Sequence, residues 1–152
     1  MEINRIGVIG AGLMGGGIAQ VAAQSGFQVN LMDVEERFVT KGIATIEKNL
    51  KRQVDKGVMQ ASEADAIRGR ITTCLSLAQL AQDVDMTIEA VIENLDLKKK
   101  VYKELDSLAA PGVIFASNTS ALSITEMASA TNRPDKFIGM HFFNPVPVMK
   151  QV

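Results

Sequence analysis

The sequence predicts an α/β fold: a doubly wound, mainly parallel sheet with helices on both faces. Three observations support this prediction. Short β-branched runs alternate with amphipathic helical patterns along the chain, which is typical of βαβ units. A glycine-rich turn joins the first run to the first helical pattern. Hydrophobic residues make up 47% of the 152 residues, which is enough for one core in one domain.

The first half of the chain reads as two strand–helix units. Residues 5–9 form a β-branched strand that stops at Gly10, and residues 13–25 form a helix that Gly26 ends. A second strand is expected over residues 28–33. Residues 35–56 carry apolar side chains three to five positions apart, which indicates one long helix. The opposite face of that helix is basic and is expected to be solvated; it comprises Lys41, Lys48, Lys51, Arg52 and Lys56.

The second half continues the same alternation. Strands are expected over residues 71–74, 86–92, 113–117 and 137–142. Helices are expected to begin near Ser62, which has an acid three positions later in a capping pattern, and to span residues 96–109 and 123–130. Ser123 and Glu126 repeat the capping pattern. Within the helix at 96–109, the run Lys98-Lys99-Lys100 is most simply a solvated face.

The glycine-rich turn predicts a dinucleotide site. Gly10-Ala11-Gly12-Leu13-Met14-Gly15 is a G-x-G-x-x-G motif that follows a strand and opens a helix, the context that the motif requires in a Rossmann-type fold. Gly10 permits the tight turn, Gly12 lets the backbone approach a pyrophosphate, and Gly15 lets the helix pack close to the strand. The helix N-terminus offers N–H groups to phosphates. Close packing against the sheet would also account for Gly16 and Gly17.

Asp33 predicts the choice of cofactor. It ends the second strand roughly 20 positions after the motif, where an acid is expected to bind the adenosine ribose hydroxyls. A carboxylate at that place repels a 2′-phosphate, so NAD is favoured over NADP. Arg37 follows shortly after and would soften this preference if it faced the ribose, but a solvent-exposed position is expected for it.

Three polar segments follow strand ends, where open α/β sheets bind ligands. They are Glu93-Asn94, Ser117-Asn118-Thr119-Ser120, and His141, the only histidine of the chain. Hydride transfer to NAD needs a base for the alcohol proton and a donor that holds the oxygen. His141 is a candidate base and a serine hydroxyl a candidate donor. Taken singly, each also has a structural interpretation, for Ser120 a helix cap or a turn.

These segments carry a resemblance to a known family. Gly10–Gly15, Glu89-Ala90-Val91-Ile92-Glu93-Asn94, Ser117–Ser120 and His141-Phe142-Phe143-Asn144-Pro145-Val146-Pro147-Val148-Met149 resemble the L-3-hydroxyacyl-CoA dehydrogenases, a group that includes 3-hydroxybutyryl-CoA dehydrogenases. The resemblance covers the whole chain. It implies oxidation of (S)-3-hydroxyacyl-CoA to 3-oxoacyl-CoA with NAD in fatty-acid and butanoate metabolism.

The resemblance also implies individual roles. His141 would be the general acid/base and Ser120 would hydrogen-bond the substrate oxygen. Ser120 and Asn144 would lie near the nicotinamide. Further cofactor contacts would come from the glycine turn with Leu13 and Met14, and from Asp33, Ala90, Glu93 and Lys98. Asn49 and Lys56 would approach the CoA moiety.

The chain departs from the family at its C-terminal end. Members continue into an all-helical domain that forms a homodimer and supplies an active-site Asn, and this domain is absent here. The acid that pairs with the catalytic His would fall just beyond Val152, and Gln151 stands where an apolar residue is usual. We therefore expect residues 1–152 to be the NAD-binding domain alone, with little or no turnover in isolation.

Composition narrows the other possibilities. A net charge of −1 gives no argument for nucleic acid or an acidic membrane as partner, and no apolar run is long enough to span a bilayer. A single cysteine, Cys74, fits a reducing cytoplasm and is expected to be a small buried hydrophobe. No metal site is expected. Alternatives are an inactive NAD-binding module, a β-hydroxyacid-type dehydrogenase domain, which Asp33 and His141 disfavour, and a crystallin-like structural role.

Overall fold

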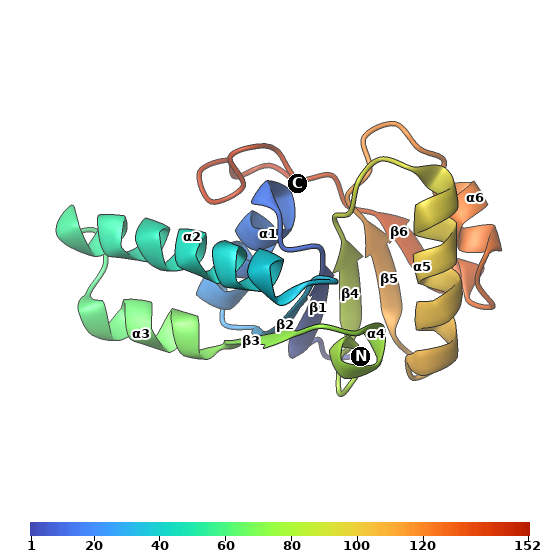
Figure 1. Ribbon diagram of the computed structural model, residues 1–152, viewed down its shortest axis with the longest axis horizontal. Coiled ribbons are helices and arrows are strands. Elements are labelled where there is room, and N and C mark those ends of the chain that lie inside the picture. Colours follow the sequence, from blue (N-terminus) through green and yellow to red (C-terminus); the bar gives the residue numbers. More distant parts are fainter.

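A computed structural model describes residues 1–152 as one six-stranded sheet covered by helices. The strands are β1 (Arg5–Ile9), β2 (Gln28–Met32), β3 (Ile71–Cys74), β4 (Met86–Glu89), β5 (Ile114–Ser117) and β6 (Phe137–Gly139). All neighbouring strands pair in parallel, in the order β3-β2-β1-β4-β5-β6 (Figure 1). The predicted fold class is confirmed.

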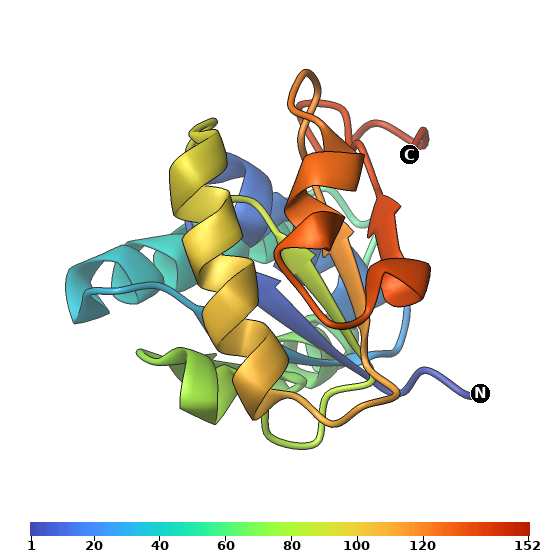
Figure 2. The same ribbon diagram turned by 90° about the vertical axis from the view of Figure 1, so that its right-hand side faces the viewer.

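Six α-helices connect the strands, and none is long and apolar enough to cross a membrane. They are α1 (Leu13–Gln24), α2 (Glu36–Asp55), α3 (Ala61–Gly69), α4 (Leu77–Leu80), α5 (Leu95–Leu108) and α6 (Ile124–Ser129); a 3₁₀ turn, Pro134–Lys136, precedes β6. Helices α2 and α3 lie side by side and extend past the edge of the sheet (Figure 1). Helices α5 and α6 lie together against the other half (Figure 2).

The sheet separates two hydrophobic cores. The larger core has 21 buried residues and joins one face of the sheet to α1, α2 and α3. The smaller core has 10 buried residues and joins the other face to α4, α5 and α6. Alternation along β1 explains the division, because Ile6 and Val8 enter the first core and Ile9 enters the second.

The strand order creates a switch point at β1. The chain leaves β1 for β2 on one side, and after β3 it crosses over to β4 on the other side of β1. Ile9 at the end of β1 is therefore flanked by Met32 of β2 and by Glu89 of β4. Ligands bind at such switch points, outside the carboxyl ends of the strands.

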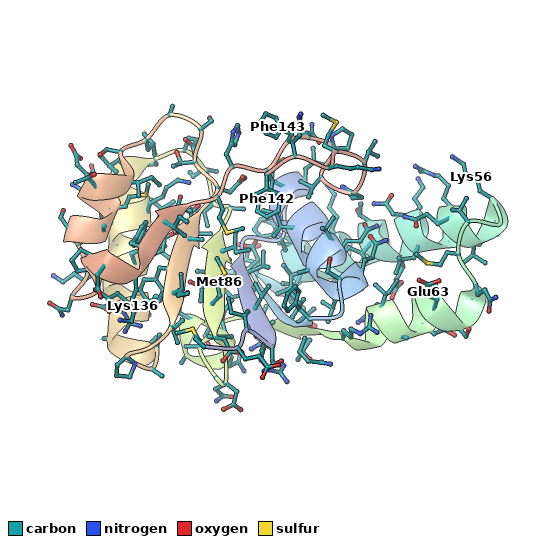
Figure 3. All side chains as sticks on the ribbon, turned by 180° about the vertical axis from the view of Figure 1, so that it is seen from behind. Lys56, Glu63, Met86, Lys136, Phe142 and Phe143 are labelled. Carbon is teal, nitrogen blue, oxygen red and sulfur yellow. The ribbon has the colours of Figure 1, made fainter.

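The C-terminal segment, residues 140–152, crosses the carboxyl edge of the sheet and reaches α1 (Figures 1 and 3). Phe142 and Val146 are buried in the larger core, whereas Phe143 is partly exposed and points away from the sheet. A Cβ atom on Gly17 would lie 2.8 Å from Cβ of Val146. Gly17 therefore makes room for this segment and not, as the sequence suggested, for the sheet.

The structure corrects several predicted boundaries. β4 ends at Glu89 instead of residue 92, because the N–H of Val91 turns back to the Glu89 carboxylate at 2.8 Å. β6 ends at Gly139 instead of residue 142, since the N–H of Phe142 bonds a side chain and not a strand. Helix α3 begins at Ala61 without a side-chain cap, so the capping role predicted for Ser62 is wrong.

Side-chain caps lie at three of the remaining helices, and Oδ1 of Asn94 caps α5 by accepting the N–H of Leu97 at 3.0 Å. The capping role predicted for Ser123 is confirmed, since its Oγ accepts the N–H of Glu126 at 3.2 Å. Helix α4 was not predicted at all. It is a single short turn, begun by Ser76, whose side chain accepts the N–H of Gln79.

Candidate functional site

The glycine turn after β1 has the geometry that a bound pyrophosphate needs. Gly10 adopts a φ of +102°, a conformation that side chains disfavour. A Cβ atom on Gly15 would lie 1.7 Å from the carbonyl oxygen of Gly10, so only glycine allows α1 to start this close to the turn. A Cβ atom on Gly12 would meet nothing within 4 Å, which leaves open space in front of the turn.

Helix α1 points its N-terminus at that open space. Gly12 is its N-cap, no side chain caps the helix, and its first turn contains no acid. The N–H groups and the positive end of the helix dipole are therefore offered to an anion. The residue that follows β4 packs against the glycine turn. The carbonyl oxygen of Ala90 lies 2.7 Å from the position that a Cβ atom on Gly10 would occupy. These residues fit a dinucleotide.

Asp33 connects the second strand to the glycine turn. Its Oδ2 accepts the N–H of Ala11 at 2.8 Å, and its Oδ1 accepts the N–H of Val34 at 2.7 Å. The carboxylate is thus held in one orientation and keeps lone pairs for a further donor. The sequence predicted a contact with ribose but not this tie to the turn.

A cavity of about 840 Å³ opens beside these residues, between the glycine turn, α1, α2 and the C-terminal segment. Its lining includes six of the residues predicted for cofactor or CoA: Gly12, Leu13, Asp33, Asn49, Lys56 and Asn144. Lys41 and Arg52 line it as well, and Asp33 is its only acid. The cavity is therefore suited to an anionic ligand. Lys41 belongs to this lining, which the expectation of a solvated face did not anticipate.

Asn49 and Lys56 occupy different depths of this cavity. The Nδ2 of Asn49 donates to Oε1 of the buried Gln20 at 3.1 Å, which fixes its amide against α1. Lys56 follows the C-terminal end of α2, at the far end of the helix pair (Figure 3). Its ammonium is exposed and free of ion pairs.

The predicted catalytic residues lie on two loops that are tied together. Ser120 follows β5 and His141 follows β6, and both side chains are exposed and form no side-chain hydrogen bond. Oδ1 of Asn118 accepts the N–H of Phe142 at 2.8 Å, so one loop holds the other. The His141 ring packs 4.9 Å from the Phe143 ring. The sequence did not predict the role of Asn118.

Glu93 lies next to these loops and joins them to β4. Its Oε2 accepts the hydroxyl of Thr119 at 2.8 Å, and Thr119 Oγ1 in turn accepts the N–H of Leu122 at 3.0 Å, which shapes the loop around Ser120. Burial alone would raise the pKa of Glu93. The hydrogen bonds from Lys98 and Thr119 and the charges of Lys98 and His141 outweigh burial and hold that pKa below its ordinary value.

Lys98 corrects the prediction of a solvated lysine face. Its side chain is 0% exposed, and its Nζ lies 2.7 Å from Glu89 Oε2 and 2.9 Å from Glu93 Oε1. Neighbouring Lys99 and Lys100 remain on the surface side of α5. Helical spacing alone did not separate Lys98 from them, because the partner Glu89 lies on another element. A direct cofactor contact of Lys98 stays a prediction.

Two further observations concern the single cysteine and possible metal ligands. Burial raises the pKa of the Cys74 thiol to about 11, so it is not a nucleophile near neutral pH. No group of three or more His, Cys, Asp or Glu side chains is placed to hold a metal ion.

Comparisons with known proteins show that the chain is similar to members of one family. A model of the family described as "3-hydroxyacyl-CoA dehydrogenase, NAD binding domain" matches residues 5–152. The chain is 47% identical over 152 residues to a probable 3-hydroxybutyryl-CoA dehydrogenase of Bacillus subtilis, covering 100% of this chain and 53% of the relative. It is 46% identical over 155 residues to the mitochondrial hydroxyacyl-coenzyme A dehydrogenase of Mus musculus, covering 99% and 49%.

A solved structure agrees with the same assignment of the fold. The crystal structure of (S)-3-hydroxybutyryl-CoA dehydrogenase from Ralstonia eutropha superimposes with a TM-score of 0.94 at 44% identity, covering 97% of this chain and 52% of that one. The chain spans about half the length of the curated relatives it matches. These likenesses favour the 3-hydroxyacyl-CoA dehydrogenase interpretation over a β-hydroxyacid-type domain.

Proposed function

Because the chain belongs to the 3-hydroxyacyl-CoA dehydrogenase family, as its NAD-binding domain, we propose that it forms the cofactor half of an enzyme that interconverts (S)-3-hydroxyacyl-CoA and 3-oxoacyl-CoA. The observation that carries the proposal is the tie between the two strand-end loops. Asn118 holds the segment of His141 against the loop of Ser120, beside the switch point that bears the glycine turn.

In this proposal one side chain of the domain transfers a proton, and another hydrogen-bonds the oxygen of the substrate. The chemistry that NAD would supply when bound is a hydride acceptor for the substrate carbon during oxidation. His141, whose imidazole can accept a proton, takes the proton of the 3-hydroxyl group. Ser120 donates its hydroxyl hydrogen to the same oxygen and stabilises it as it becomes a carbonyl. In the reverse direction His141 returns the proton to that oxygen.

The rest of the site binds and orients. We infer that Gly10, Gly12, Met14 and Gly15 of the turn and the start of α1 hold the pyrophosphate. Asp33 takes the ribose hydroxyls and excludes a 2′-phosphate. Ala90, Glu93, Ser120 and Asn144 surround the nicotinamide end, and Lys98 lies buried behind Glu93. This arrangement follows the order of the strands, from β2 across β1 to β4, β5 and β6.

Asn49 and Lys56 are proposed to bind the CoA portion of the substrate. They line the basic cavity on the α2 side, where Lys41 and Arg52 add positive charge. In a protein that carries this domain with the second half of the family, Lys56→Ala is expected to raise KM for acyl-CoA with little change in kcat. Lys48→Ala is the matched control, since Lys48 is on α2, the helix that Lys56 follows, but does not line the cavity. Equal effects of both substitutions would contradict this role.

The catalytic assignment has a direct test in the same two-domain protein. His141→Gln is expected to abolish oxidation of NADH with acetoacetyl-CoA and to leave NADH affinity nearly unchanged. Ser120→Ala should also lower kcat strongly, whereas the control Ser129→Ala, an exposed hydroxyl on α6, should not. Activity of His141→Gln at the unsubstituted rate would refute the proposal.

The wider setting is part of the same proposal. We infer that the full-length protein is a homodimer formed through its helical half, that it works in the cytoplasm, and that its partner molecules are acyl-CoA esters, not nucleic acid or membrane. The single cysteine, which forms no disulfide, is in keeping with that location. Light scattering of the two-domain protein measures its oligomeric state, and a monomer at working concentration would contradict the dimer.

A further inference from the structure

A buried ionic cluster lies behind the proposed nicotinamide site. It consists of Glu89 at the end of β4, Lys98 on α5, and Glu93 between the two elements. The ammonium of Lys98 bridges both carboxylates, at 2.7 Å from Glu89 and 2.9 Å from Glu93. The side chains of Glu89 and Lys98 are 0% exposed and that of Glu93 is 45% exposed. Glu93 is therefore the only member of the cluster that reaches solvent.

Three hydrogen-bond donors hold Glu89. Its Oε1 accepts the hydroxyl of Ser117 at 2.6 Å, and its Oε2 accepts the N–H of Val91 at 2.8 Å in addition to the ammonium of Lys98. The Tyr102 hydroxyl lies 3.4 Å from Oε1 and gives its single hydrogen to the carbonyl oxygen of Ala116 at 2.8 Å. This donor set matches a carboxylate, which only accepts. Two carboxylates then share one ammonium, and the cluster keeps one net negative charge in a poorly screened place.

The exposed part of this negative charge, on Glu93, lies near the residues that are proposed to react. Glu93 contacts Thr119, the neighbour of Ser120, and lies within electrostatic reach of His141. In the proposed function Glu93 is one of the residues at the nicotinamide end, so its charge acts on the bound ring. The nicotinamide ring carries a positive charge when oxidised and none when reduced, so only the oxidised form is attracted by a net negative cluster.

We propose that Glu89 is a positioning residue that shares Lys98 with Glu93 and so leaves an uncompensated negative charge facing the nicotinamide, which favours the oxidised cofactor relative to the reduced one. The inference rests on the proposed function, in which Glu93 contacts the cofactor. Without the charge of Glu89, Lys98 would neutralise Glu93 fully, and the cluster would no longer distinguish the two ring charges.

The test compares the affinities of the 152-residue chain for NAD⁺ and NADH by calorimetry. Glu89→Gln keeps the size of the side chain and removes its charge. Glu93→Gln removes the charge of the half-exposed carboxylate. Each is expected to lower the ratio of NAD⁺ affinity to NADH affinity by about threefold to tenfold, the range for losing one nearby charge that is partly screened. Glu126→Gln, which loses a distant surface pair with Lys99, is the control and should leave the ratio unchanged.

The ratio separates this effect from structural damage. A distorted site weakens both cofactor forms together, because they share every contact outside the ring, and leaves their ratio constant. An unchanged ratio in the folded variants would overturn the inference. If Glu89→Gln does not fold, Glu93→Gln at its half-exposed position decides the question of charge. Failure of the unsubstituted chain to bind either form would instead contradict the proposed function.

Discussion

Oδ1 of Asn118 accepts the backbone N–H of Phe142 at 2.8 Å, and this bond joins the loop that bears Ser120 to the segment that bears His141. The two predicted catalytic side chains have no hydrogen bond to each other. Their relative position therefore depends on the backbone of both loops, which Asn118 and Thr119 hold.

Asn118→Ala is expected to lower kcat of the two-domain protein by roughly 10- to 100-fold, since small displacements of catalytic groups are costly. NADH affinity should change little, because Asn118 does not contact the glycine turn. Asn118→Asp keeps an acceptor oxygen for Phe142 and should recover part of the rate. Steady-state kinetics with NADH and acetoacetyl-CoA measure both. A rate for Asn118→Ala equal to that of the unsubstituted protein would exclude this role.

Asp33→Ala is expected to narrow the preference for NAD(H) over NADP(H). The carboxylate would face a 2′-phosphate, and its removal relieves that repulsion. Affinity for NAD(H) should also fall, because Asp33 holds the N–H of Ala11 in the turn. Calorimetric titration of the 152-residue chain with both cofactors checks the prediction. Equal affinities of the unsubstituted chain for NAD(H) and NADP(H) would show that Asp33 does not determine the choice of cofactor.

The 152-residue chain alone is expected to oxidise NADH with acetoacetyl-CoA very slowly or not at all. Hydride transfer requires the substrate carbon to be held against the cofactor, and this chain presents its strand-end loops to open solvent. Adding the helical half of a family member should raise the rate. Turnover by the chain alone at an ordinary enzymatic rate, about 1–1000 per second, would refute this expectation.

Thr87→Val is expected to stabilise the domain by about 1 kcal/mol. Thr87 is fully buried on β4, and its Oγ1 has no hydrogen-bond partner, so the native state bears the cost of a desolvated hydroxyl. Valine has the same shape and favours strands. Urea unfolding provides the measurement, with Thr72→Val on the exposed part of β3 as control. A lower free energy of unfolding for Thr87→Val would mean that the hydroxyl of Thr87 has a hydrogen-bond partner.

Asp85 predicts a pH-dependent contribution to folding. The N–H groups of Asn4 and Arg5 hydrogen-bond its carboxylate and lower its pKa from the ordinary value of 3.8. Because the folded pKa lies below the unfolded one, the stabilisation is present above pH 3.8 and is lost as the pH falls through the lowered pKa.

The corresponding experiment compares Asp85→Ala with the unsubstituted chain at several pH values. The variant should be less stable at pH 7, and the difference should shrink towards pH 3. Asp65→Ala, an exposed acid on α3 without a hydrogen bond, should show no such trend. A difference that stays constant with pH would show that the ionised carboxylate is not what matters.

Local sequence patterns were sufficient to predict most of the strands and helices and the dinucleotide-binding part of the site. The alternation of strands and helices, the glycine turn and Asp33 are read from neighbours in the chain, because each depends on spacing within one βα unit. The same local view misplaced the ends of β4 and β6, where a side chain of another residue takes the N–H that would have continued the strand. It also missed α4, which is too short to show a period.

The amino-acid sequence by itself determined the doubly wound fold, the dinucleotide turn and the identity of the polar residues at the strand ends. Only the tertiary structure decided that Lys98 is buried between Glu89 and Glu93, that Lys41 lines the cavity, and that Gly17 makes room for Val146. The physical reason is that burial and ion pairing are properties of residues brought together from distant elements. A helix pattern gives each lysine a face, but the neighbouring elements determine whether that face meets water or a carboxylate.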